Sequence, residues 1–77
     1  NPFNPNTVIS YQLPVSGDVN LKVYDVLGNE IAILVDEYKP AGMYNVQFTM
    51  NNLSSGVYFY RFKVGNYVST KKMILLR

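Results

Sequence analysis

The amino-acid sequence predicts an all-β fold, an antiparallel β-sandwich of six to seven short strands. Apolar and polar residues alternate with period two through most of the chain, whereas the period of a helix is nearly absent. Turn-forming residues interrupt this alternation roughly every 8–12 residues, which is the spacing typical of a sandwich. A small barrel or a roll is the alternative architecture.

The first two strands are predicted at residues 7–13 and 19–26. A turn at residues 14–18 separates them, because Pro, Ser, Gly and Asp occur together there. The apolar residues at odd-numbered positions of both strands are expected to face the core: Ile9, Tyr11, Leu13, Val19, Leu21 and Val23.

A tight turn at residues 27–29 leads into a third strand at 30–35. Gly28 and Asn29 of this turn suit a backbone with positive φ. A polar loop is predicted from 36 to 42. The apolar residues of the third strand are irregularly spaced, which indicates a bulge or burial on both faces: Ile31, Ile33, Leu34 and Val35.

The fourth strand, at residues 43–50, alternates most clearly, and its even-numbered residues are expected to face the core. A loop follows at 51–56, in which Leu53 is expected to plug the core. The fifth strand, at 57–64, has apolar residues on both of its faces, which is typical of a central strand.

The chain ends on a strand bounded by cations. The turn Gly65-Asn66 leads into a closing strand at 67–76. Residues 71–77 place two lysines before an apolar run and an arginine after it. Such a short run cannot span a bilayer, which needs about 20 residues. We therefore predict a buried final strand with positive charge at both ends.

The composition argues against catalysis and against a metal or cofactor. Histidine, cysteine and tryptophan are all absent, which removes the usual nucleophile–base pairs and most transition-metal ligands. The acids are scattered and the glycines stand singly, so neither a carboxylate pair nor a phosphate-binding loop is predicted. Asp36 and Glu37 are adjacent, and we interpret them as a solvated loop in preference to a weak calcium site. The sequence predicts that the chain is not an enzyme.

Asp25 is predicted to hold the turn after the second strand. It lies on the same row as Leu21 and Val23, and an inward carboxylate must be hydrogen-bonded. We interpret it as an acceptor for backbone N–H groups of the turn around Gly28, with a functional role as the alternative.

The net charge of +2 hides an uneven distribution. Residues 1–60 hold two lysines and five acids, whereas residues 61–77 hold five cations and no acid. These cations are interpreted as solvated charges that protect a strand edge, with a recognition patch for an acidic partner as the alternative. The seven tyrosines could form a sugar-binding surface, although four of them lie on apolar rows. No basic stripe alternates with aromatics, so nucleic-acid binding is not predicted.

Four segments of the chain together form a pattern of turns and alternating strand residues. They are NPFNP followed by TVISY at the start, LKVYDVLG at 21–28, LSSGVY at 53–58 and KKM at 71–73. In order and spacing they resemble the C-terminal sorting domain of type IX secretion substrates. The resemblance covers essentially the whole chain. The related Ig-like domain of flagellar hook-capping proteins shares part of it.

The resemblance implies an Ig-like β-sandwich at the C-terminus of a larger secreted protein from a Bacteroidetes-like bacterium. Residues 1–6 would be a lead-in and 7–77 the domain. In that family an outer-membrane translocon recognises the domain, and a surface peptidase usually removes it, here upstream of Asn1. The N-terminal passenger is transiently periplasmic and is then secreted or attached to the cell surface. The implied recognition residues are Gly56, Val57, Tyr58, Lys71, Lys72, Met73, Ile74, Leu75, Leu76 and Arg77.

A self-assembling building block of an extracellular filament or adhesive surface is the alternative function. Unprotected strand edges, or a donated N-terminal segment, would pair between copies. An open head-to-tail contact between identical copies would yield a fibre. The two functions are compatible with each other.

Overall fold

The computed structural model describes residues 6–49 and 53–75, which form six strands. Each strand is antiparallel to its neighbours. The strands are β1 (Asn6–Leu13), β2 (Gly17–Asp25), β3 (Glu30–Lys39), β4 (Gly42–Thr49), β5 (Gly56–Val64) and β6 (Tyr67–Leu75).

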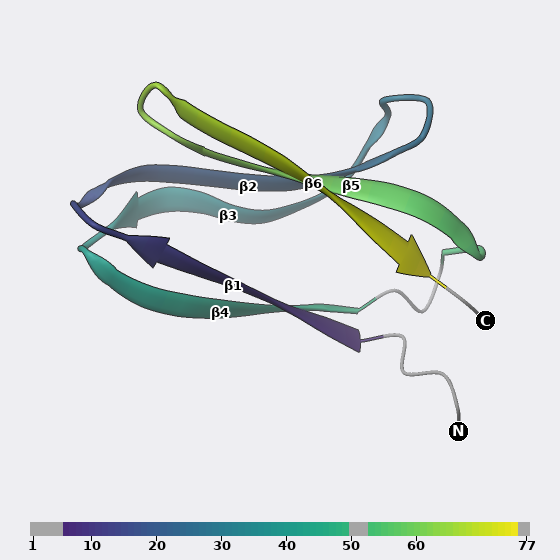
Figure 1. The fold of residues 1–77 in the computed structure, drawn as a ribbon, viewed down its shortest axis with the longest axis horizontal. Helices are drawn as coiled ribbons and strands as arrows, with labels where there is room; N and C mark the ends of the chain where they lie inside the picture. Colours follow the sequence, from purple (N-terminus) through teal and green to yellow (C-terminus); the bar gives the residue numbers. More distant parts are fainter. Residues whose placement is uncertain (1–5, 50–52, 76–77) are drawn as a thin grey trace.

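The six strands form two sheets of unequal width. One sheet pairs β1 with β4, and the other has the order β3-β2-β5-β6. The two sheets form the layers of a small sandwich (Figure 1). The predicted all-β sandwich is therefore confirmed, and β5 is a central strand as its apolar faces indicated.

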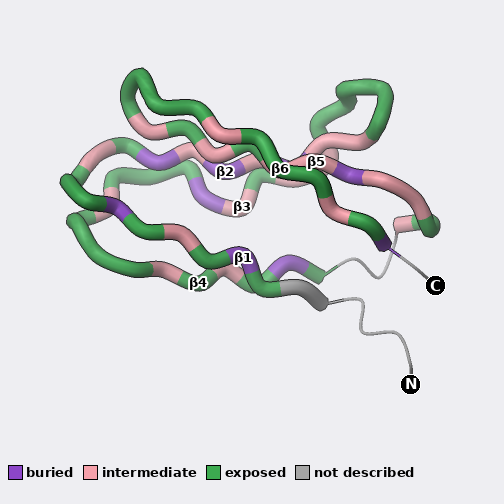
Figure 2. The backbone as a smooth tube through the Cα atoms, viewed as in Figure 1, coloured by how far each residue is buried: buried purple, intermediate pink, exposed green. Residues whose placement is uncertain are grey.

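The core lies between the two sheets, where buried positions recur along the strands (Figure 2). As predicted, β1 and β2 bury odd-numbered residues, whereas β4 and β5 bury even-numbered ones. Leu53 is half-buried and packs against the core, also as predicted. The buried residues are Ile9, Leu13, Val19, Leu21, Val23, Val35, Phe48, Tyr58 and Leu75.

The strand β3 differs from its prediction in length. The irregular pairing between β2 and β3, after Leu21 and after Val23, confirms the predicted bulge. The loop predicted at 36–42 is wrong, because β3 continues to Lys39 and β4 begins at Gly42. Polar residues such as Asp36 resemble a loop in sequence, yet an edge strand with a solvent-facing side carries them equally well.

The turn between β2 and β3 depends on one glycine. Gly28 has a φ of 86°, whereas no residue other than glycine among those described has a positive φ. The expectation for Asn29 was therefore wrong, since one left-handed residue is enough to reverse the chain here. The second strand also ends at Asp25, so Val26 belongs to the turn.

Candidate recognition site

The pairing of β5 with β6 unites the two segments that the sequence singled out. The start of β5 lies opposite the end of β6, although the chain turns back only at Gly65 and Asn66. Leu76 and Arg77 lie outside the described residues. The Cα partners are Gly56 with Leu75, Val57 with Ile74, and Tyr58 with Met73.

The residues of this paired end divide between two faces. Tyr58 and Leu75 are buried in a core cluster, and Met73 packs against it. Ile74 points the other way and is 63% exposed. The prediction of a wholly buried final strand is therefore wrong. Because the sandwich has two layers and the side chains of a strand alternate, only one face of β6 reaches the core between the sheets.

The two lysines of β6 also lie on opposite faces. Lys71 is the partner of Tyr60 and lines a groove between the sheets. Lys72 is the partner of Phe59, on the outer face of the sheet. Both side chains are exposed, and neither makes an ion pair or hydrogen bond with the described residues.

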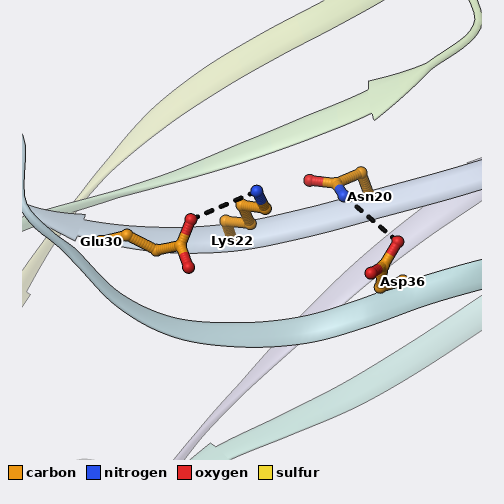
Figure 3. A network of polar contacts seen from close by, with 4 residues as sticks. All are labelled: Asn20, Lys22, Glu30 and Asp36. Carbon is orange, nitrogen blue, oxygen red and sulfur yellow. Dashed lines mark hydrogen bonds and ion pairs between the residues drawn. The ribbon is translucent and has the colours of Figure 1, made fainter.

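Charge is distributed unevenly across the four-stranded sheet. On β2 and β3, Lys22 Nζ lies 3.2 Å from Glu30 Oε1, and Asn20 Nδ2 donates to Asp36 Oδ1 at 3.4 Å (Figure 3). Such exposed pairs contribute little stability. On β5 and β6, by contrast, the cations have no such side-chain partner among the described residues: Arg61, Lys63, Lys71 and Lys72.

The Asp25 carboxylate lies beside the same site and organises the β2–β3 turn. Asp25 is the Cα partner of Tyr58 on the side of β5 away from β6. Its Oδ1 accepts hydrogen bonds from the backbone N–H groups of Leu27 and Asn29, both at 2.9 Å, and its Oδ2 accepts one from Asn29 Nδ2 at 3.1 Å. These bonds, above all the one from the Asn29 backbone, lower the pKa of Asp25.

A hydrogen bond anchors the loop that precedes β5. Tyr58 Oη donates to the backbone oxygen of Ser54 at 2.7 Å. Tyr58 and Ser54 also line a surface depression of about 350 Å³, together with Asp25, Leu27 and Leu53. Ser54 was expected only as part of the turn before β5, because nothing in its residue type marks its backbone oxygen as the acceptor for a tyrosine.

The arrangement offers a surface for binding. Among residues 6–49 and 53–75, no three or more acidic side chains gather closely enough to hold a metal ion. The described part of the chain also has no helix with the length and apolar character needed to cross a membrane. Backbone groups at a free strand edge, unpaired cations and an exposed isoleucine are features through which proteins bind one another.

The described residues form a small all-β sandwich domain. The model of the family described as "Secretion system C-terminal sorting domain" matches residues 1–76. The chain belongs to this family of type IX secretion sorting domains, which is not catalytic. Membership implies a larger N-terminal passenger, the secretion machinery as partner, and export to the cell surface or beyond it. Comparisons with curated proteins and with solved structures gave no match.

Proposed function

We propose that the outer-membrane translocon recognises this sorting domain at the paired ends of β5 and β6. The observation that supports the proposal is the pairing of Gly56, Val57 and Tyr58 with the residues that end β6. The two segments implied by the family resemblance thereby lie side by side at one end of the sheet. Leu76 and Arg77 extend the proposed surface in sequence.

The contacts differ in what they contribute to recognition. The free edge of β6 offers backbone N–H and C=O groups to a strand of the translocon, which supplies affinity. The outward side chains Lys72 and Ile74 supply orientation and an apolar contact. Tyr58, Met73 and Leu75 act indirectly, because they fix the two strands to the core.

In this proposal the domain is a non-catalytic sorting signal. It folds while the passenger is in the periplasm, directs the passenger across the outer membrane, and is then removed by a surface peptidase upstream of Asn1. The passenger is released or attached to the cell surface.

A pair of matched variants tests the proposal. Ile74→Thr and Val68→Thr change the same residue class on the outward row of β6, at opposite ends of the strand, and both positions are exposed. Each variant is fused to a periplasm-directed fluorescent reporter in a bacterium with type IX machinery. We expect Val68→Thr to reach the surface like the unmodified domain and Ile74→Thr to stay in the periplasm.

The folding of both variants is checked by urea denaturation of the purified domains. This control matters because truncation of residues 71–77 would also remove the buried Leu75 and could abolish folding. Normal surface export of Ile74→Thr and of Lys72→Glu, with both domains folded, would contradict recognition at this end of the sheet. Multimers of the purified domain on size-exclusion chromatography would instead favour the filament function.

A further inference from the structure

The narrow sheet leaves part of the wide sheet uncovered. A groove of about 620 Å³ runs between β1 and β6, over the inner side of β5. Five consecutive residues of β1, from Ile9 to Leu13, line it, which places the groove along the edge of that strand. Across from this edge the lining is largely apolar and aromatic, and it includes Tyr60, Phe62, Val64 and Tyr67.

The strand edges differ in how they are protected. Among the described residues, each of β1, β3, β4 and β6 has one unpaired edge. The edge strand β3 is bulged against β2 and carries acids, and β6 carries two adjacent lysines. Bulges and lysines are the usual devices that keep an edge from pairing indiscriminately with other chains, so a strand that pairs with β6, as proposed for the translocon, would need charges that match its lysines.

The strand β1 lacks both devices. It contains no charged residue and no proline, and its pairing with β4 runs without a register shift from Asn6 to Leu13. The same holds for β4, yet no residue of β4 lines the groove. Of these edges, β1 therefore combines an unprotected backbone with an adjacent apolar groove.

An extended peptide strand fits this combination. A strand paired with the free edge of β1 would turn alternate side chains toward the groove, where Phe62, Val64 and Tyr67 would cover them. The narrow sheet would then have three strands facing four.

The positive charge in the groove favours an incoming strand that carries an acidic residue. Lys71 is the one charged side chain among the groove-lining residues, and it has no ion pair or hydrogen bond with the described residues. A carboxylate on the incoming strand would therefore be favoured near Lys71. Two copies of this chain paired through β1 would bring their β6 strands toward each other. Each β6 carries Lys71 and Lys72, so like-charge repulsion disfavours this pairing.

We propose that the free edge of β1 and the groove between β1 and β6 accept an extended strand of another protein, apolar at alternate residues and acidic at the residue that meets Lys71. This site consists of the free edge of β1 and the groove on the inner side of β6, whereas the proposed translocon surface consists of the free edge and outer face of β6 and the end of β5. The two proposals can therefore fail independently.

The test uses two fluorescently labelled eight-residue probe peptides. Both alternate valine with threonine, and they differ only in one central residue, which is glutamate or lysine. Fluorescence anisotropy is measured with the unmodified domain. We expect the glutamate peptide to bind more tightly by about fivefold, as for a partly exposed ion pair. Amide hydrogen exchange is expected to slow along β1 when this peptide is bound.

Charge reversal at two neighbouring lysines provides the matched control. Lys71→Glu is expected to reverse the preference in favour of the lysine peptide. Lys72→Glu, one residue further along and on the opposite face, is expected to leave the preference unchanged. Ser69→Trp should fill the groove and abolish binding, whereas Thr70→Trp on the outer face should not. Unfolding midpoints establish that each variant is folded.

Several outcomes would overturn the proposal. One is the absence of binding of either peptide at millimolar concentration. Another is an equal loss of preference in Lys71→Glu and Lys72→Glu, which would indicate attraction to net charge alone. A third is protection of β1 that rises with the concentration of the domain itself, since the groove would then be occupied by a second copy.

Discussion

Tyr58 and Met73 are partners across β5 and β6, and both side chains turn toward the core between the sheets. This pair links the two stretches, at the open end of the β5–β6 hairpin, that the family resemblance marks for recognition. It also implies that many of the marked residues support the surface from behind. The following predictions separate such supporting residues from those that face a partner.

Replacing Tyr58 with phenylalanine is expected to lower the free energy of unfolding by about 1 kcal/mol, because it removes the hydrogen bond to Ser54. Urea denaturation measures this loss as a lower midpoint with an unchanged slope. Tyr67→Phe is the control, since Tyr67 is exposed. Equal stability of the two variants would mean that the bond to Ser54 contributes nothing net.

Leu75→Ala is expected to destabilise the domain by about 2–5 kcal/mol, because it opens a cavity beside Val23 and Phe48. Ile74→Ala, at the adjacent but exposed residue, is expected to change stability by less than about 0.5 kcal/mol. Thermal or urea unfolding of the two variants measures the contrast. Similar losses in both would place the two side chains in similar surroundings, contrary to the structure.

Gly28→Ala is expected to cost about 1–2 kcal/mol, because an L-residue with a side chain disfavours the φ of 86° found there. Steric contact is not the cause, since a Cβ at Gly28 would meet no atom within 4 Å. Gly28→Asn should cost less, because asparagine tolerates this conformation better. If alanine and asparagine prove equally harmless in urea denaturation, backbone strain at this turn is excluded.

Asp25→Ala is expected to destabilise the domain at neutral pH and to matter less in acid. The folded state lowers the pKa of Asp25, so its contribution is present above the unfolded pKa of about 3.9 and is lost as the pH falls through the folded value. Unfolding midpoints of the variant and the unmodified domain should therefore differ at pH 7 and converge below about pH 4. Asp18→Ala, at an exposed residue, serves as the control. A gap that stays constant down to pH 2 would show that the carboxylate charge plays no part.

Much of the architecture could be predicted from local patterns. Alternation correctly assigned the inward rows of β1, β2, β4 and β5, because successive side chains of a strand point to opposite faces whatever the strand pairs with. Turn-forming residues likewise located the reversals at Gly28 and Gly65. The family could be recognised for the same reason, since its motifs are turns and alternating strands in a fixed order.

Alternation was insufficient where a residue's surroundings depend on a neighbouring strand. The polar end of β3 was predicted as a loop, because local composition does not reveal that Asp36 and Glu37 pair with β2. The final apolar run was predicted as buried, because the run itself does not reveal that the sandwich covers only one face of β6 and leaves Ile74 in solvent.

The groove between β1 and β6 is a product of long-range packing, because β1 belongs to a different sheet from β5 and β6. Lys71 and Lys72 are adjacent and chemically identical, and the alternation of a strand turns them to opposite faces. Only the arrangement of the two sheets decides that the face of Lys71 lines the groove beside β1. Residue type and spacing identified the cations and the strands that carry them. The register between β5 and β6 follows from the two-residue turn at Gly65 and Asn66. The unequal widths of the two sheets arise from contacts between distant parts of the chain, and these widths open the groove that Lys71 lines.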